Sequence, residues 1–304
     1  MTPADPPVVT GREHWTRKGN VRLFLWEKFV DSPAAKPAVL FVHGSSMASQ
    51  PTFDLAVPGR PDSSVMDWFA QRGFVCWCVD MEGYGRSDKH RDVDCDIANG
   101  ADDLAAATDY IVDARGIGRF LTYGISSGAL RAALFAERHP ERVARLALDA
   151  FVWTGEGAPT LAQRRKKLPE FLATKRRPID RAFVHSIFER DHPECAEKRV
   201  VDAFADAILA LDDSMPNGTY IDMCSKLPVV DPARIAAPTM VMRGEHDGIA
   251  ALDDLIDFFV RLPNADKQFT MMAGISHASF QQKNYLMAYR ILHAWFTQAD
   301  PVYR

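Results

Sequence analysis

The pentapeptide Gly124-Ile125-Ser126-Ser127-Gly128 follows an apolar run at residues 119–123 and precedes a helical pattern at residues 129–136. This order predicts a strand, a sharp turn and a helix, with Ser126 at the apex of the turn. So abrupt a turn needs a strained backbone at its apex and exposes the apex side chain. The flanking residues must be small, because a Cβ atom there would collide with the neighbouring strand or helix. Ser126 is therefore the candidate nucleophile, and the alternative is an ordinary glycine-rich connection.

Apolar runs recur along the chain at spacings that need crossover helices. Four of them suit strands buried on both faces of a parallel sheet, at residues 38–42, 74–79, 119–123 and 143–148. Helices are predicted between them at residues 65–70, capped by Asp62 or Ser63, and at 96–114, ending at Gly116. An alternating outer strand is expected at residues 21–30, a loop at 47–64, strands at 238–243 and 269–272, and helices at 252–259 and 280–295. This rhythm predicts an α/β fold with a doubly wound, mostly parallel sheet.

The rhythm breaks after Asp149. Thr160-Leu161-Ala162-Gln163 has the pattern of a capping box that opens one helix, and Pro178 suits the first turn of a second. Residues 200–211 outline a third helix, and no strand-like run interrupts the three. We therefore expect a helical insertion at residues 155–227, between two parts of one core domain at 1–154 and 228–304.

The composition is that of an ordinary globular protein. The 304 residues are 47% hydrophobic and 25% charged, and the net charge of −4 gives no general attraction to nucleic acid or anionic membranes. A transmembrane helix needs about 18 uninterrupted apolar residues, and no stretch of the sequence approaches this length. The polar, proline-rich start at residues 1–7 is unlike a secretory signal.

The five cysteines are an odd number in a chain large enough to need no disulfides, which predicts a reducing cytoplasm. Cys76 and Cys78 should lie on one side of a strand, whereas Cys95, Cys195 and Cys224 are scattered. Without paired Cys/His spacing, buried small side chains are expected rather than metal ligands. No metal and no cofactor are predicted.

A serine alcohol needs a base to remove its proton, and the base needs a third group to orient it. Both partners should follow strands that end at the same edge of the sheet as Ser126. Two loops supply them: residues 244–248, which contain Asp247, and residues 274–277, which end in His277. Glu245 and Asp149 remain alternative carboxylates. Ser127 is a poorer nucleophile candidate because the turn centres on Ser126.

Five motifs in this order resemble those of α/β-hydrolase fold enzymes with a helical cap: His43-Gly44, residues 80–88, 124–128, 244–247 and 274–277. The resemblance implies an eight-stranded sheet with a cap inserted after the sixth strand. It also implies that Ser126 is the nucleophile, His277 the general base and then acid, and Asp247 the orienting carboxylate. The backbone N–H groups of Ser45 and Ser127 would form the oxyanion hole, and His43 would buttress the turn.

The resemblance implies a cofactor-independent serine hydrolase that cleaves a small carboxylic ester through an acyl-enzyme on Ser126. The alternatives are a carbon–carbon bond hydrolase of ring-cleavage products and a non-catalytic ligand-binding protein. Basic runs in the insertion, at residues 164–167 and 175–177, are either solvated faces or a source of cations for a substrate carboxylate. The candidate substrate-binding residues, for which core packing is the alternative, are Ser46, Phe53, Trp153, Arg164, Arg176 and Met223, with Phe151 and Val152 as further candidate walls.

Overall fold

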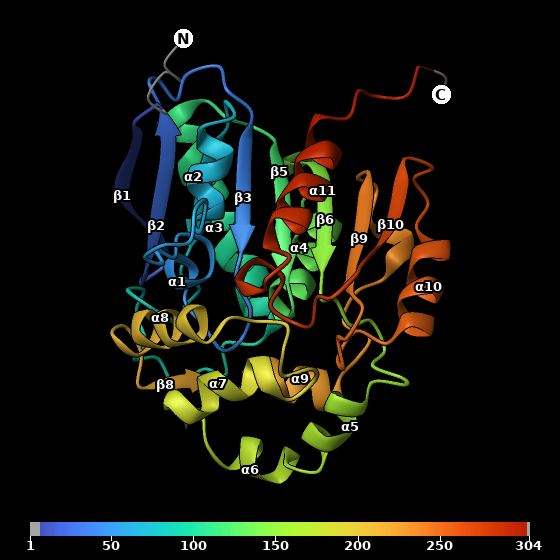
Figure 1. The fold of residues 1–304 in the computed structure, drawn as a ribbon. Coiled ribbons are helices and arrows are strands. Elements are labelled where there is room, and N and C mark those ends of the chain that lie inside the picture. The colour runs from blue at the N-terminus through green and yellow to red at the C-terminus, as the bar shows by residue number, and fades with distance from the viewer. Residues whose placement is uncertain (1–6, 303–304) are drawn as a thin grey trace.

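A computed structural model describes residues 7–302, so most of the polar N-terminal stretch lies outside the described residues (Figure 1). Within this range the main sheet has eight strands in the order β1-β2-β4-β3-β5-β6-β9-β10. The pairs β1–β2 and β2–β4 are antiparallel, and the other pairs are parallel. The strands are β1 (Val9–Lys18), β2 (Val21–Val30), β3 (Ala38–Val42), β4 (Val75–Val79), β5 (Phe120–Ile125), β6 (Val143–Asp149), β9 (Thr239–Gly244) and β10 (Lys267–Met272). The predicted mostly parallel, eight-stranded sheet is confirmed.

Helices cover both faces of the sheet, because successive strand residues point to opposite sides. In β4, Trp77 packs with the core shared by α3 (Ile97–Arg115), α4 (Ser127–Arg138) and α10 (Leu252–Arg261). Cys76 and Cys78 instead join the core of α2 (Val65–Ala70) and α11 (Tyr285–Thr297). The prediction that these two cysteines share one side is confirmed, as is the doubly wound arrangement. All five cysteines are unpaired and buried.

Several local predictions are corrected by backbone geometry. β1, which the sequence did not predict, is a polar edge strand held along its whole length by β2. The N-cap of α2 is Ser64, whose side chain accepts from the Asp67 N–H, and neither Asp62 nor Ser63 has this role. α11 begins at Tyr285 after a short 3₁₀ turn, η3 (Ser279–Gln281), and the loop at 47–64 contains α1 (Ser49–Phe53). As expected, α3 ends at Gly116, which takes the left-handed conformation with φ 69°.

The insertion between β6 and β9 lies beyond the ends toward which the arrows of β3 and β6 point (Figure 1). Two short strands form a separate ribbon in it, so the prediction of an uninterrupted helical segment is wrong. Thr160 is not an N-cap, because it lies inside its helix, one residue after the first helical residue. Its hydroxyl donates to Asp191 at 2.9 Å. Pro178 ends a strand, and Asp180 caps the next helix. The elements are α5 (Pro159–Arg165), α6 (Leu168–Ala173), β7 (Arg176–Pro178), α7 (Arg181–Glu189), α8 (Lys198–Leu209), β8 (Ser214–Pro216) and α9 (Gly218–Ser225), with 3₁₀ turns η1 (Pro140–Arg142) and η2 (Pro232–Arg234) outside the insertion.

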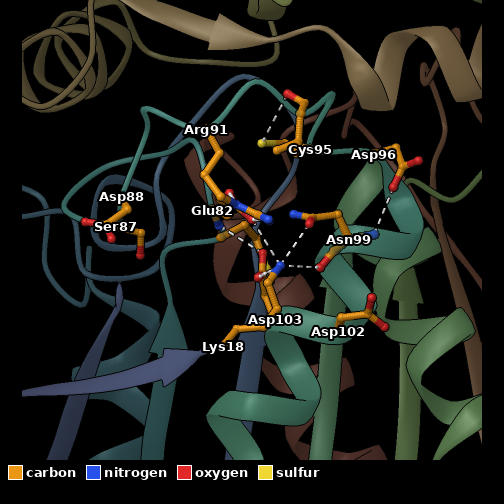
Figure 2. A network of polar contacts seen from close by, with 12 residues as sticks. Lys18, Glu82, Ser87, Asp88, Arg91, Cys95, Asp96, Asn99, Asp102 and Asp103 are labelled. Atoms are coloured by element: carbon orange, nitrogen blue, oxygen red, sulfur yellow. Dashed lines mark hydrogen bonds and ion pairs between the residues drawn. The ribbon is translucent and has the colours of Figure 1, made fainter. Parts of the chain in front are cut away.

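A buried ionic network fixes the loop that follows β4 (Figure 2). Lys18, the last residue of β1, contacts Glu82 of the loop at 3.1 Å and Asp103 of α3 at 2.5 Å. Arg91 closes on Glu82 from the other side at 2.5 Å, and the Glu82 N–H donates to Asp103 at 2.9 Å. Glu82 and Asp103 are buried, and a buried carboxylate without a partner would be costly. The network therefore ties β1, the loop and α3 into one unit beside the strand ends.

Among residues 7–302, no helix has both the length and the apolar character needed to cross a lipid bilayer.

Candidate active site

Ser126 occupies a strained turn between β5 and α4, with φ 59° and ψ −127°. A Cβ atom on Gly124 would lie 2.4 Å from the carbonyl oxygen of Gly128, and one on Gly128 would lie 2.3 Å from that of Val42. The N–H of Ser126 donates to the carbonyl of Asp149 at 2.9 Å, which holds the apex against β6. The steric requirement inferred from the pentapeptide is therefore met by backbone atoms on both sides of the serine.

His277 lies between Ser126 and Asp247. Its Nε2 atom is 2.9 Å from Oγ of Ser126, and its Nδ1 atom is 3.1 Å from each carboxylate oxygen of Asp247. The three residues come from the ends of β5 and β9 and from the loop after β10, and all three side chains are buried. This arrangement can pass a proton from the serine to the imidazole while the carboxylate fixes the ring.

Asp247 is held in its ionised form. Burial alone would raise its pKa, but the charge and hydrogen bond of His277, together with the Ile249 N–H, lower the pKa to about 2. The Ile249 N–H donates to Oδ1 at 2.9 Å and the Ala250 N–H donates to the same oxygen at 3.3 Å. A carboxylate held in this way stabilises an imidazolium on its neighbour.

The two alternative carboxylates have other partners. Asp149 accepts a hydrogen bond from the Tyr123 hydroxyl at 2.6 Å, and burial raises its pKa to about 7. The side chain of Glu245 is 51% exposed and accepts from the Gly274 N–H at 2.8 Å. Neither hydrogen-bonds to His277 among the described residues. The geometry therefore favours Asp247.

The turn at His43-Gly44 packs directly against the apex. A Cβ atom on Gly44 would lie 3.4 Å from that of Ser126. Nδ1 of His43 donates to the Gly44 carbonyl at 2.7 Å and Nε2 accepts from the Met81 N–H at 3.0 Å. Burial and the Arg131 cation lower the pKa of His43 to about 3, so the ring is neutral. His43 thus supports the turn.

The two expected oxyanion donors lie on either side of Ser126. Ser127 is the first residue of α4, so its N–H has no acceptor within the helix. Ser45 follows the His43-Gly44 turn and lines the same cavity as Ser126. The Ser45 carbonyl accepts from Arg177 at 3.0 Å, which ties this turn to the insertion.

Comparison with known proteins identifies the family. The model of a family described as serine aminopeptidase, S33, matches residues 33–284. The chain belongs to this family. Its members are α/β-fold hydrolases, and the fold and order of motifs agree with that assignment.

Solved structures with the same fold have low sequence identity to this hydrolase. A thermophilic esterase from Thermogutta terrifontis, bound to malate, is 18% identical with a TM-score of 0.67, covering 94% of this chain and 98% of the esterase. An esterase from Exiguobacterium antarcticum is 13% identical with a TM-score of 0.71, covering 94% and 100%. The 2-hydroxy-6-oxo-6-phenylhexa-2,4-dienoate hydrolase from Rhodococcus sp. strain RHA1 is 16% identical with a TM-score of 0.67, covering 96% and 100%. At these identities the likeness extends to the fold alone.

The cavity above Ser126 in this hydrolase is small. Its volume is about 10 Å³, which is room for about one water molecule. Residues that precede β6 in the chain, together with the loop after β10, form the floor of this cavity, and the insertion forms its roof. The lining residues are Ser45, Ser46, Met47, Ser126, Arg164, Ile187, Arg190, Tyr220 and His277.

Two arginines stack on the ring of Tyr220 in the roof. The guanidinium carbon of Arg164 lies 4.0 Å from the ring centroid and that of Arg177 lies 3.7 Å from it. Burial would raise the pKa of Tyr220, but these two cations more than offset it and lower the pKa to about 7. Its hydroxyl is 3.2 Å from Oγ of Ser46. An ionisable phenol therefore lies between two cations above the nucleophile.

Arg164 has no carboxylate partner among residues 7–302, which distinguishes it from Arg176. All three donor nitrogens of Arg176 are used: NH1 donates to the Gly83 carbonyl at 2.9 Å, and Nε and NH2 donate to Ser214 at 3.0 and 2.6 Å. Arg176 ties the insertion to the loop after β4 and does not line the cavity. Of the two predicted cations, the structure brings only Arg164 to the site.

Three predicted pocket walls lie elsewhere. Phe53 packs among core aromatics, 5.2 Å from the ring centroid of Phe41. Trp153 donates its indole N–H to the Val230 carbonyl at 3.1 Å, and Met223 is fully buried in the core that includes the insertion. Apolar residues on one face of a helix or strand can line either the core or a pocket. These three side chains pack in the core.

Sequence reasoning missed Met47, Ile187, Arg190 and Tyr220 as lining residues. Tyr220 lies on α9, a helix that was not predicted, and Arg190 is a single cation outside both basic runs. Only the chain's return over the sheet edge brings them to Ser126, so no local pattern marks them.

A second cavity, of about 1110 Å³, lies on the other side of Asp247, between α5, the loop after β9 and α10. Its lining includes Glu156, Asp253 and Asp257, and it reaches neither Ser126 nor His277. It is therefore not the space in which Ser126 would meet a substrate.

Proposed function

We propose that this protein is a serine hydrolase that cleaves a carboxylic ester of a small organic molecule through an acyl-enzyme on Ser126. The observation that carries the proposal is the continuous contact from Asp247 through His277 to Oγ of Ser126, at 3.1 and 2.9 Å, beside a small cavity. Five unpaired, buried cysteines fit a reducing cytoplasm as its location.

The reaction runs in two halves. His277 accepts the proton of Ser126 as Oγ attacks the ester carbonyl carbon, and Asp247 stabilises the imidazolium. The Ser45 and Ser127 N–H groups stabilise the negative oxygen of the tetrahedral intermediate. His277 then gives its proton to the departing alkoxide, which leaves an acyl group on Ser126. Water, deprotonated by His277, attacks that acyl group and releases the acid.

The substrate carries a carboxylate besides its ester group. The cavity has two arginines, Arg164 and Arg190, and no carboxylate side chain in its lining within the described residues. Arg164 has no carboxylate partner there, so a substrate carboxylate would supply one. The malate in the esterase structure and the dienoate in the name of the Rhodococcus hydrolase are also carboxylates. The same lining is unsuited to the protonated amine of an aminopeptidase substrate.

The insertion, residues 155–227, acts as a cap over a core formed by residues 1–154 and 228–304. A cavity of about 10 Å³ cannot hold an ester, so the cap must move before substrate binds. Arg164, Ile187, Arg190 and Tyr220 would move with it, because all four belong to the insertion.

The test is a substrate panel with Ser126→Ala as the blank. It compares p-nitrophenyl esters of a neutral acid and of a dicarboxylic acid, an amino-acid p-nitroanilide and a vinylogous diketone acid. The proposal expects the dicarboxylic half-ester to be cleaved best, with release of p-nitrophenol in a burst. Preferred cleavage of the anilide or of the diketone would overturn it in favour of a peptidase or a carbon–carbon hydrolase.

A fluorophosphonate probe tests the nucleophile separately. The wild type should be labelled and Ser126→Ala should not be. Equal labelling of both proteins, or no labelling of the wild type, would reject Ser126.

A further inference from the structure

Three side chains with metal-binding atoms meet beside the loop that carries Asp247. His192 and Cys195 lie between α7 and α8, and His246 is the residue before Asp247. Their ligand atoms all lie within 4.8 Å of one another. The imidazole rings of His192 and His246 are stacked, with centroids 4.1 Å apart and an interplanar angle of 28°.

One of these side chains has a buried nitrogen without a hydrogen-bond partner. Nδ1 of His192 has none among residues 7–302, although it is shielded from solvent. Orphaned buried nitrogens of this kind are uncommon and call for an explanation. The Nε2 atom of His246 is 3.6 Å from the nearest Glu245 oxygen, too far for a hydrogen bond. Both rings therefore have a nitrogen free to bind a ligand.

We propose that His192, Cys195 and His246 bind a zinc-like divalent cation that joins the insertion to the loop of Asp247. Two imidazole nitrogens and a thiolate suit Zn²⁺, which is bound at about 2.0–2.3 Å in tetrahedral geometry. Ligand atoms in such a site are about 3.5 Å apart, so modest side-chain rotations close the present spacing. On binding, the Cys195 thiol releases its proton to solvent and the sulfur donates an electron pair to the metal.

The fourth ligand is a water molecule or the carboxylate of Glu245, which is next in sequence to His246. Glu245 and His246 line the large cavity beside Asp247, and the His246 side chain is 30% exposed. The ion therefore has a route of entry from solvent that does not cross the reaction cavity.

The backbone around the cluster connects it to both loops of the candidate active site. The Lys283 N–H donates to the Cys195 carbonyl at 2.7 Å, and the His246 N–H donates to the Ile275 carbonyl at 2.9 Å. Ile275 is two residues before His277. A bound ion would brace the loops of Asp247 and His277 against the segment between α7 and α8.

Two of the three ligands stand close together in the sequence, so the expectation that no paired Cys/His spacing is present is wrong. His192-Pro193-Glu194-Cys195 has the spacing of a ligand pair, but its third member lies 51 residues beyond Cys195. Only packing of the insertion against the core brings His246 to the pair.

The test uses the full-length protein, freed of metal by a chelator and titrated with Co²⁺ as a spectroscopic substitute for Zn²⁺. The wild type should bind one equivalent, with a thiolate-to-cobalt charge-transfer band that Zn²⁺ abolishes by competition. Cys195→Ser should lose the band, and His192→Gln and His246→Gln should each weaken binding at least about tenfold. Cys224→Ser, another buried cysteine of the insertion, should behave as wild type.

Thermal unfolding keeps the outcome clear if a variant folds poorly. Zn²⁺ should raise the melting temperature of the wild type and of Cys224→Ser but not that of His246→Gln, because only proteins with the site gain from binding. The inference is overturned if the wild type shows no charge-transfer band, or if Cys195→Ser retains it. Neither readout depends on hydrolysis, so both stand apart from the proposed ester cleavage.

Discussion

The guanidinium carbon of Arg164, on α5, lies 4.0 Å from the ring centroid of Tyr220, on α9. This contact joins the first and last helices of the insertion and places a cation without a carboxylate partner above Ser126. Because Arg177 stacks on the same ring, two positive charges act on one phenol. Charge, more than apolar shape, is what the insertion adds to the cavity.

Tyr220 should ionise near neutral pH. Its pKa of about 7, against an ordinary value of 10.0, predicts a tyrosinate absorbance transition near pH 7 that Tyr220→Phe lacks and Tyr110→Phe keeps. Between these two pH values Tyr220 is protonated in the unfolded chain but ionised in the folded protein. Ionisation of Tyr220 therefore increases the stability of the fold as pH rises from about 7 to 10, and this contribution is lost as pH falls through 7. The free energy of unfolding of wild type relative to Tyr220→Phe, measured in urea, should therefore increase over this range. A constant difference would contradict the assignment.

Asp247 should matter far more for turnover than the neighbouring carboxylates. Asp247→Asn should lower kcat by about 10⁴-fold, because the amide would hold the wrong tautomer of His277. Asp149→Asn and Glu245→Gln are the matched controls, and both should retain most activity. Steady-state kinetics with the best ester of the panel measures this. A larger loss in Asp149→Asn would transfer the role to the end of β6.

Arg164→Gln should raise KM for esters that carry a second carboxylate by about 10- to 100-fold, since a charge-assisted hydrogen bond contributes about 1.5–3 kcal/mol. Neutral esters of similar size should be little affected. Arg165→Gln, on the next residue and exposed, controls for net charge. An equal rise in KM for both classes of ester would mean that Arg164 supports the roof without binding the carboxylate.

Gly128→Ala should destabilise the fold and abolish labelling of Ser126. The new Cβ would meet two backbone oxygens, those of Val42 at 2.3 Å and His43 at 2.5 Å, neither of which can move without shifting β3. We expect a loss of at least about 2 kcal/mol in the free energy of unfolding. Gly118→Ala is the control, because its Cβ would meet nothing within 4 Å. Equal stability of the two variants in urea would rule out this packing.

The features that local constraint dictates were predictable from the sequence. The Ser126 turn needs a glycine on each side, and the loops of Asp247 and His277 each follow a recognisable apolar strand. β1 escaped prediction because a polar edge strand has no apolar pattern and forms by pairing with β2. Arg164 and Arg176 look alike in sequence. The fold brings Ser214 and Gly83 next to Arg176, and hydrogen bonds to them already occupy its guanidinium group.

The pocket itself was less predictable than its floor. Phe53, Trp153 and Met223 are apolar in the way that pocket walls are, but core residues have the same pattern. Tyr220 and Arg190 line the same cavity as Ser126 only because the chain returns across the sheet edge. Contacts of that range depend on how the insertion packs, which periodicity and motif spacing do not encode.

The small volume of the cavity above Ser126 has a kinetic consequence. Because the cavity has room for about one water molecule, the proposed reaction needs the insertion to move before substrate binds, so the rate of encounter should be set by that movement. Second-order rate constants for substrates of different intrinsic reactivity should then converge on one ceiling set by the protein. Raising solvent viscosity should lower that ceiling equally for all substrates, and shortening the insertion should remove the ceiling.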